Sequence, residues 1–597
     1  MPAMTSAPAT ARAVEPESYR EPGRCAVSGG IERNGGQILV ESLIGAGTEF
    51  IFGVPGDTGV VFYDALRECT GRIRHVLAND ERCAVFMADV FARSSNRVGV
   101  AEVSSGGGAT FAVGGLGEAL AASVPLVLIA SDIQTRSRGT GAITETDVVA
   151  LFAGVTKRQE IVLSTAAIPQ AVTMAFAAAT SGRPGPVVLI LPEDVLEGHV
   201  DVTTKTIPSH LPSERLPASD KSVALAAATL AAAKRPAIVA GSGVHWSAAW
   251  KELAALSEKL AAPVATTIHG KGAISERHPL SLGIVGSNGA RPYANDYLAD
   301  ADAVLFIGTR ANSTDTNGFT SPPRNGPAVI QIDIEAERAG RNFPGSLPLV
   351  GDARTILDQL RHAVPQAAED VSRARIAELA ERRTVWRSAQ PPRSANGQLD
   401  PYEIISAISR IAADDAIVVG EPGTPTPYLS SYWEIPQAGR RVILPRGHGP
   451  MGYALPGAVG AAMAHPGKPI IAFTTDGSLL MACGALEQVK RLKLPITYIH
   501  FNNASLGWIK TLQHLYFERR FFGVDFERFD AAAIARGFGL EASRPANVNE
   551  IVAAVKGGME SMTPLFLDVW VPAEHELLPP VAPWVAAVQG DVKRPIY

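Results

Sequence analysis

The stretch KPIIAFTTDGSLLMACGALEQVKRLKLPITYIHFNN (residues 468–503) constrains the fold more than any other part of the sequence. PIIAFTT and ITYIHFNN have the length and apolar character of buried strands, and the segment between them has apolar residues at helical spacing. Such a unit forms a right-handed crossover between two parallel strands. Both strands then end at the same edge of the sheet, where open α/β sheets bind ligands. We therefore expect Asp476 and Asn503, which follow the two strands, to lie together.

These residue types suit a divalent cation and a phosphate group. A carboxylate, an amide oxygen and a nearby backbone carbonyl are ligands that Mg²⁺ prefers, with substrate phosphates at its other positions. Gly477 and Ser478 would open the crossover helix, whose N-terminus favours phosphate. The alternative is that DG and NN are only turn dipeptides. Two such pairs at the ends of adjacent strands favour a binding site.

Alternating strand and helix patterns continue along most of the chain. They predict an α/β protein with repeated doubly wound parallel sheets, in three blocks. A polar, Pro-containing stretch ends the first block, and the charged segment 363–398 separates the second from the third. Residues 1–30 are rich in Ala, Pro, Ser and Glu and are expected to be disordered.

Composition excludes several classes of protein. The 597 residues are 46% apolar and 19% charged with a net charge of −5, which supports large cores and argues against nucleic-acid or anionic-membrane partners. The four cysteines form no CxxC pair, so neither a disulfide framework nor a zinc knuckle is indicated. No long uncharged apolar run and no signal-peptide pattern are present, so a cytoplasmic location is the default expectation.

The motifs resemble those of a known enzyme family. Asp476-Gly477, 24 intervening residues and Asn502-Asn503 resemble the GDG…NN fingerprint of thiamine diphosphate enzymes, with Thr475 in place of the leading Gly. The resemblance is strongest to the acetolactate synthase-like branch. Supporting stretches are FGVPGD (52–57), SSGGGAT (104–110), HGKGAISERHPLSLGIVG (269–286) and GPMGYALPGAVGA (449–461).

The resemblance implies three domains and a set of cofactor ligands. The domains would be a pyrimidine-binding domain (31–205), a central domain (218–362) and a diphosphate-binding domain (398–575), followed by a C-terminal tail (576–597). The implied metal ligands are Asp476, Asn503 and the Ser505 carbonyl, and the implied cofactor-binding residues are Thr424, Thr426, Gly449, Met451, Asp476, Gly477, Ser478 and Asn503.

Glu81, in NDERCAVFMADVFAR, matches the activating glutamate of the family. By this resemblance it would hydrogen-bond the aminopyrimidine ring of thiamine diphosphate and promote the tautomer that takes up the thiazolium proton. From the residues alone, Glu81 is also explained as a helix N-terminal glutamate. Asp80 replaces the usual His, and two adjacent carboxylates influence each other's protonation.

The expected substrate wall departs from the family pattern. Ile143 and Thr144 replace the Phe and Gln of GTDAFQETD, Leu512 replaces the Trp of the acceptor pocket, and Phe111 replaces an Asn. Lys157 matches a lysine near the family's substrate channel, although a surface lysine is an equal explanation. We therefore expect an intact cofactor site with an altered substrate.

The same resemblance bears on flavin binding and on the assembly of subunits. GTRANSTDTNG (308–318) resembles the FAD-binding GVRFDDR segment but keeps only Arg310 of its characteristic residues, which leaves FAD open. In the family, the glutamate and the diphosphate-binding domain of one active site come from different subunits. A homodimer or homotetramer with active sites at the subunit interface is implied.

The implied activity is decarboxylation of a 2-oxo acid, with transfer of the remaining fragment to a second carbonyl compound. The first alternative is a simple decarboxylase that releases an aldehyde, although the His pair of such enzymes is absent from the sequence. An oxidase that uses FAD and a non-catalytic ligand-binding relative are further alternatives.

Overall fold

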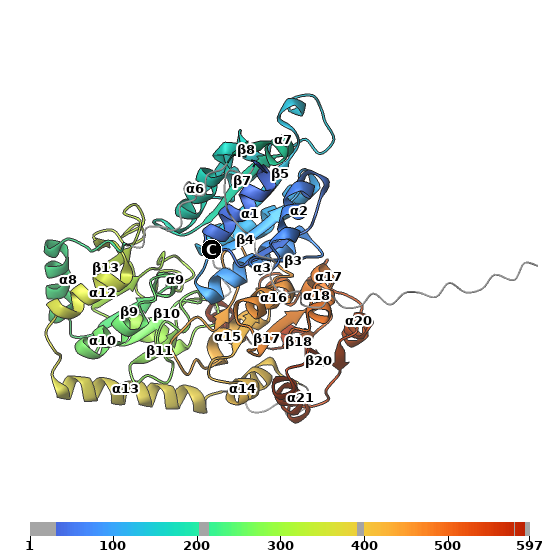
Figure 1. The fold of residues 1–597 in the computed structure, drawn as a ribbon. Coiled ribbons are helices and arrows are strands. Elements are labelled where there is room, and N and C mark those ends of the chain that lie inside the picture. Colours follow the sequence, from blue (N-terminus) through green and yellow to red (C-terminus); the bar gives the residue numbers. More distant parts are fainter. Residues whose placement is uncertain (1–31, 202–213, 391–398, 578, 591–597) are drawn as a thin grey trace, which may run out of the picture.

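The computed structural model describes residues 32–201, 214–390, 399–577 and 579–590. It contains three six-stranded sheets, each with only parallel strand pairs and flanking helices (Figure 1). The predicted fold class is therefore confirmed. The tail expected at 1–30 lies outside the described residues.

The first unit has strand order β3-β2-β4-β5-β7-β6. Its two faces are covered by separate hydrophobic cores, as predicted for a doubly wound sheet. The strands are β2 (Phe50–Gly53), β3 (Arg74–Leu77), β4 (Gly99–Val103), β5 (Leu126–Asp132), β6 (Arg158–Ile161) and β7 (Pro186–Pro192). The helices are α1 (Gly35–Gly45), α2 (Val60–Glu68), α3 (Glu81–Ser95), α4 (Gly107–Ala122), α5 (Val148–Ala153), α6 (Ile168–Thr180) and α7 (Glu193–Glu197). A short antiparallel pair, β1 (Glu32–Asn34) with β8 (His199–Asp201), joins the ends of this unit.

The second unit has strand order β11-β10-β9-β12-β13-β14. The strands are β9 (Pro236–Ala240), β10 (Val264–Thr266), β11 (Ser281–Ile284), β12 (Ala303–Ile307), β13 (Ala328–Asp333) and β14 (Leu347–Val350). The helices are α8 (Asp220–Ala232), α9 (Ser242–Trp246), α10 (Trp250–Leu260), α11 (Pro292–Ala299), α12 (Ala353–Ala363) and the long α13 (Glu369–Ser388), which runs along one side of the molecule in Figure 1.

The third unit has strand order β16-β15-β17-β18-β20-β19 and carries the fingerprint residues. The strands are β15 (Ile417–Gly420), β16 (Val442–Ile443), β17 (Ile470–Thr475), β18 (Ile496–Asn502), β19 (Glu541–Ser543) and β20 (Leu565–Trp570). The helices are α14 (Pro401–Ile411), α15 (Pro425–Tyr432), α16 (Ala454–Ala464), α17 (Asp476–Ala482), α18 (Ala485–Leu492), α19 (Gly507–Tyr516), α20 (Ala531–Gly537) and α21 (Val548–Ser561).

Helices α3 and α16 join the first and third units through one continuous core. Gly460 of α16 lies against α3 so closely that a Cβ atom at this position would be 2.1 Å from the carbonyl oxygen of Met87. Glycine permits such backbone contact because it has no side chain. The start of α3, where Glu81 lies, is thereby fixed relative to the third unit.

The C-terminal segment is folded where the structure describes it. After Leu577 the chain forms α22 (Ala582–Val588), and the buried Trp584 packs on Trp508 of α19 with ring centroids 4.4 Å apart. Within the described residues, no helix is both long and apolar enough to span a membrane.

Candidate active site

Asp476 and Asn503 are brought together at the carboxyl edge of the third sheet. Their strands, β17 and β18, pair in parallel with Thr475 opposite Phe501. Asp476 is fully buried, and its Oδ2 accepts hydrogen bonds from the backbone N–H groups of Asn503 at 2.8 Å and Ala504 at 2.9 Å. One carboxylate oxygen therefore fixes the loop that follows β18.

The other oxygen of Asp476 is left for a ligand. Its Oδ1 is buried and has no hydrogen-bond partner among the described residues, and His500 Nε2 lies 3.4 Å away. Asn503 Oδ1 accepts from the backbone N–H and the hydroxyl of Ser505, both at 3.1 Å. Unpaired buried carboxylate oxygens are costly, so this arrangement fits a hard cation with oxygen ligands. No group of three or more His, Cys, Asp or Glu side chains suited to a metal occurs in the described ranges, so such an ion would also use amide and backbone oxygens.

Gly477, at the start of α17, is in contact with the side chain of Met451. A Cβ atom at Gly477 would be 2.5 Å from Met451 Cε and 3.0 Å from Leu506 Cδ2. Gly449, two residues before Met451, has φ +72°, a left-handed conformation that favours glycine. The structure thus brings the expected cofactor residues Gly449, Met451, Gly477 and, next along α17, the buried Ser478 to one edge.

Thr424 and Thr426 lie at the start of α15, at the end of β15 in the same sheet. The Thr424 hydroxyl donates to Glu574 Oε2 at 3.0 Å, and the Thr426 hydroxyl donates to the backbone carbonyl of Glu421 at 2.6 Å. Both threonines are buried. Their hydroxyl protons are therefore committed to protein acceptors, and only their oxygens remain for a ligand.

Glu81 is the first residue of α3, immediately after the turn that follows β3. Asp80 is the helix N-cap and accepts from the backbone N–H of Cys83 at 3.2 Å. A Cβ atom at Gly108 would lie 3.2 Å from Glu81 Oε1, so glycine at this point keeps the backbone close to the carboxylate. Glu81 therefore lies at the carboxyl edge of the first sheet, the position that the sequence predicts for it.

Part of the expected substrate wall lies near Glu81. Thr144 has φ +65° and its hydroxyl accepts a hydrogen bond from Ser105 at 2.8 Å, while its side chain packs on Gly106. Phe111 and Ile143 are 61% and 87% exposed in the single chain, which is uncommon for large apolar side chains. A β-branched residue with positive φ is a strained arrangement that occurs at functional sites.

Two expected substrate residues are not joined to this group by any contact in the described chain. Lys157 donates its ammonium protons to the carbonyls of Ala178, Ser181 and Arg183 at 2.5–2.9 Å, at the end of α6. These bonds give Lys157 a structural role. Leu512 lies on α19 in the third unit and is only half-buried.

Buried carboxyl groups near the site were not predicted from the sequence. Glu102, at the end of β4, accepts a hydrogen bond from Tyr63, whose hydroxyl is also 3.2 Å from His75 Nε2. Burial raises the pKa of Glu102 to about 8. Burial likewise raises the pKa values of Glu421 and Glu574 to about 7. The sequence shows that these glutamates lie near the ends of predicted strands, which could have marked them as site residues. Nothing in the sequence pattern shows that they are buried.

A cavity of about 700 Å³ lies between the first and second units. It includes the ends of β12 and β13 and five arginines: Arg97, Arg183, Arg215, Arg310 and Arg338. Four acidic residues also line the cavity (Glu214, Asp315, Asp333 and Asp352), and Arg215 pairs with Asp352, so only part of this positive charge is left for an anionic ligand at the carboxyl edge of the sheet.

Comparisons with known proteins agree with this arrangement. The chain matches the family descriptions "Thiamine pyrophosphate enzyme, N-terminal TPP binding domain" at 33–151, "central domain" at 223–360 and "C-terminal TPP binding domain" at 421–569. A probable acetolactate synthase large subunit of Methanococcus aeolicus is 33% identical over 552 residues, which cover 90% of this chain and 91% of the relative. The acetolactate synthase isozyme 3 large subunit of Escherichia coli is 30% identical, over 92% and 96% of the two chains. The acetolactate synthase large subunit of Lactococcus lactis is 31% identical, over 92% and 94%.

Proposed function

The chain belongs to the thiamine pyrophosphate enzyme family, in its acetolactate synthase-like branch, and from this premise we propose that it decarboxylates a 2-oxo acid and joins the remaining fragment to a second carbonyl compound. Thiamine diphosphate, when bound, supplies the electron sink that such chemistry requires. The observation that carries the proposal is the buried Asp476, which fixes the Asn503 loop with one oxygen and whose other oxygen has no hydrogen bond from the described residues.

In our proposal, separate residues of this chain bind the metal, bind the cofactor and transfer a proton. Asp476, Asn503 and the Ser505 carbonyl hold Mg²⁺. The diphosphate would be held by Gly477, Ser478, Thr424 and Thr426. The Gly449 carbonyl and Met451 would hold the aminopyrimidine end of the cofactor. Glu81 holds and releases a proton at the pyrimidine ring, which is general acid–base work suited to a positioned carboxyl group.

The substrate is proposed to differ from that of a housekeeping acetolactate synthase. Phe111, Ile143, Thr144 and Leu512 replace the residues that the resemblance places around the substrates. Each such contact changes discrimination by about 1–3 kcal/mol, so several together change the preferred acid or acceptor. Lys157 is the weakest member of this proposed set because three carbonyls already occupy its ammonium group.

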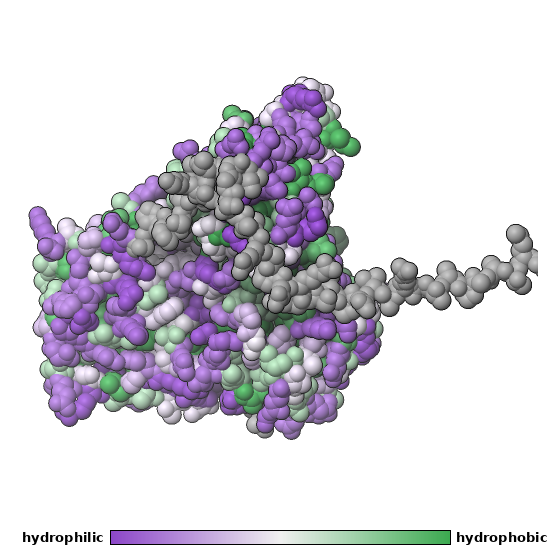
Figure 2. Space-filling view, in the orientation of Figure 1, coloured by the Kyte–Doolittle hydropathy of each residue, from purple (hydrophilic) through white to green (hydrophobic). Residues whose placement is uncertain are grey.

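The working unit is proposed to be a homodimer or homotetramer, with Glu81 of one chain facing the diphosphate-binding unit of another. Exposed apolar side chains support this proposal, since Phe111, Ile143 and Phe522 would each be covered by a second chain. Figure 2 also shows hydrophobic residues along the margin of the first unit. Domain limits at 31–205, 218–362 and 398–575 are part of the same proposal.

FAD or a smaller nucleotide is proposed for the arginine-rich cavity between the first and second units. The cavity's volume of about 700 Å³ and Arg310 at its wall support such a ligand. The absorbance spectrum of the purified enzyme checks the choice: bands near those of oxidised flavin indicate FAD, and absorbance from an adenine nucleotide alone indicates the smaller ligand.

Product analysis tests the proposed reaction. The enzyme with thiamine diphosphate and Mg²⁺ is given a panel of 2-oxo acids, with and without aldehyde or 2-oxo acid acceptors, and CO₂ and all products are measured. A 2-hydroxy ketone or 2-hydroxy acid that appears only with both reactants supports carboligation. CO₂ with free aldehyde alone supports the simple decarboxylase instead. Binding of thiamine diphosphate without turnover of any acid supports a non-catalytic relative.

A further inference from the structure

Glu118, in the middle of α4, holds a backbone loop of the third unit. Its Oε1 accepts from the N–H of Gly447 at 3.1 Å, and its Oε2 accepts from the N–H groups of His448 at 2.6 Å and Gly449 at 3.1 Å. Three consecutive backbone N–H groups of residues 447–449, which we term the cradle loop, thus converge on one carboxylate. Hydrogen bonds to an ionised acceptor are stronger than those between neutral groups.

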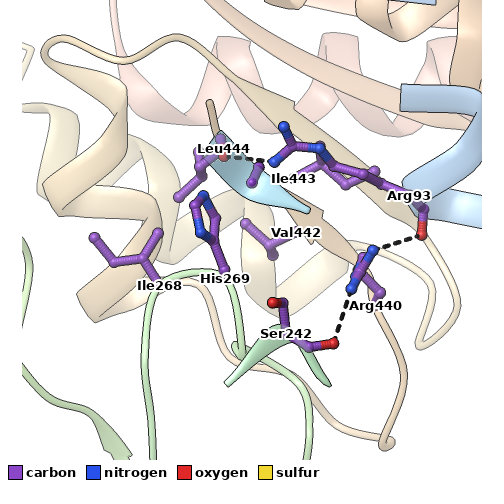
Figure 3. Close-up of a pocket in the computed structure, with 9 residues that line it drawn as sticks. Arg93, Ser242, Ile268, His269, Arg440, Val442, Ile443 and Leu444 are labelled. Carbon is purple, nitrogen blue, oxygen red and sulfur yellow. Dashed lines mark hydrogen bonds between the residues drawn. The ribbon is translucent and has the colours of Figure 1, made fainter. Parts of the chain in front are cut away.

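The carboxylate is kept charged in a fully buried position. Burial opposes ionisation, but the Arg93 guanidinium, 2.9 Å away, and the N–H of His448 hold the pKa of Glu118 below its usual range. Arg93 also donates to the carbonyl of Leu444, just before the cradle loop (Figure 3). Asp89 and Tyr453 complete the cluster around Arg93.

The cradle loop also packs directly on α4. A Cβ atom at Gly447 would be 2.9 Å from the Cβ of Ala121, and one at Gly117 would be 2.6 Å from His448 Nδ1. The loop ends at Gly449, whose φ of +72° directs the chain toward Met451 and the start of α17. The shape of this turn therefore depends on its contacts with α4.

In the proposed dimer, Glu81 and the cradle loop of one chain serve two different active sites, and α4 contacts both of them. α4 begins at Gly107-Gly108, beside Glu81, and carries Glu118 about three turns further along. We propose that Glu118 is a positioning residue that sets the cradle loop, and with it the Gly449 carbonyl and Met451, for the aminopyrimidine end of thiamine diphosphate. This inference rests on the proposed function, but Glu118 is not among the residues to which the family resemblance assigns a role.

Glu118→Gln tests the inference with little change in shape. Each oxygen of Glu118 accepts from two donors, whereas an amide offers one oxygen and places N–H donors opposite the remaining donors. Asp89→Asn is the matched variant, since it alters the same Arg93 cluster without touching the N–H groups of the cradle loop. Asp302→Asn is a remote control, because Asp302 accepts from the backbone N–H groups of Lys234 and Arg235.

Calorimetric titration of each full-length variant, in the presence of Mg²⁺, compares thiamine diphosphate with inorganic pyrophosphate. Glu118→Gln is expected to weaken thiamine diphosphate binding by at least about tenfold, which corresponds to about 1.4 kcal/mol, and to leave pyrophosphate binding unchanged. Asp89→Asn and Asp302→Asn are both expected to bind the two ligands as the unmodified enzyme does. Thermal unfolding of the same samples identifies any general loss of stability.

Equal losses for both ligands in Glu118→Gln, no loss for either, or the same selective loss in Asp89→Asn would overturn the inference. Failure of the unmodified enzyme to bind thiamine diphosphate would instead contradict the proposed function on which the inference rests.

Discussion

Three buried carboxyl groups, those of Glu102, Glu421 and Glu574, lie near the proposed cofactor site, and no ion pair to any of them is found in the described part of the chain. Burial is the largest cause that raises the pKa of Glu102 to about 8 and the pKa values of Glu421 and Glu574 to about 7. Each instead accepts hydrogen bonds, from Tyr63, from the backbone of Tyr453 and Ala454, and from Thr424, respectively. A buried carboxyl without a counter-charge takes up a proton more readily than an exposed one.

The titration of Glu102 makes the free energy of unfolding depend on pH. Its pKa of about 8 in the folded protein exceeds the ordinary value of 4.5, so the folded state binds this proton more tightly. The stabilisation is fully present below pH 4.5 and is lost as pH rises through 8, by about 1.4 kcal/mol per pH unit within that range. Glu102→Gln keeps an acceptor for Tyr63 and removes the titration. Thermal unfolding of the cofactor-free protein from pH 6 to 9 is expected to show a smaller decline in the variant, and parallel declines would refute this role.

The site is predictable from the sequence where residues follow strand ends in order. Asp476 and Asn503 meet because two adjacent parallel strands end at one edge, and Glu81 follows a strand of the first sheet in the same way. The roles of these residues remain predictions. Glu118 and Glu574 were not foreseen because their contacts join segments more than 100 residues apart. Periodicity carries no information about such contacts.

The sequence pattern predicts the buried central strands, whereas edge strands are harder to recognise from it. β9 and β12 are continuous apolar runs, and β17 and β18 are largely apolar and buried, because helices cover both faces of each sheet. β6, with sequence RQEI, lies at the edge of the first sheet and is only half-buried along its length. A strand that is partly exposed lacks the apolar pattern by which a strand is recognised.

The contact between α3 and α16 gives a stability prediction. Gly460→Ala places a Cβ atom 2.1 Å from the Met87 carbonyl oxygen, and backbone on both sides leaves no flexible group to move. We expect the free energy of unfolding to fall by roughly 2–4 kcal/mol, as in overpacked cores. Gly557→Ala, in α21 with no atom of the described structure within 4 Å of its Cβ, is the matched control and is expected to stabilise by up to about 1 kcal/mol. Equal unfolding midpoints in denaturant for the two variants would contradict the close helix contact.

In the whole molecule, the first and third α/β units share one core, and our proposal completes the active site with a second chain. The first and third units of one chain are locked together through α3, α4 and α16. Apolar side chains such as Ile143 and Phe522, each 87% exposed, nevertheless remain at the surface of the single chain. Where such side chains form a contiguous patch, they mark a protein interface.

Subunit complementation tests a site shared between chains. Glu81→Gln and Asp476→Asn are each expected to be inactive as homodimers. When the two are co-expressed, random pairing makes half of the dimers mixed, and each mixed dimer has one site with both residues intact, so about a quarter of the unmodified activity is expected. Mixed dimers that form but show no activity would place Glu81 and Asp476 of one site in the same chain.

In our proposal, proton exchange in this thiamine pyrophosphate family enzyme depends on Glu81. The measurement that tests it most directly is the rate of CO₂ release from the best 2-oxo acid by Glu81→Gln, at saturating thiamine diphosphate and Mg²⁺. Loss of a positioned acid–base group predicts a decrease of about 10²-fold or more, with thiamine diphosphate still bound. An unchanged rate in Glu81→Gln would contradict the account.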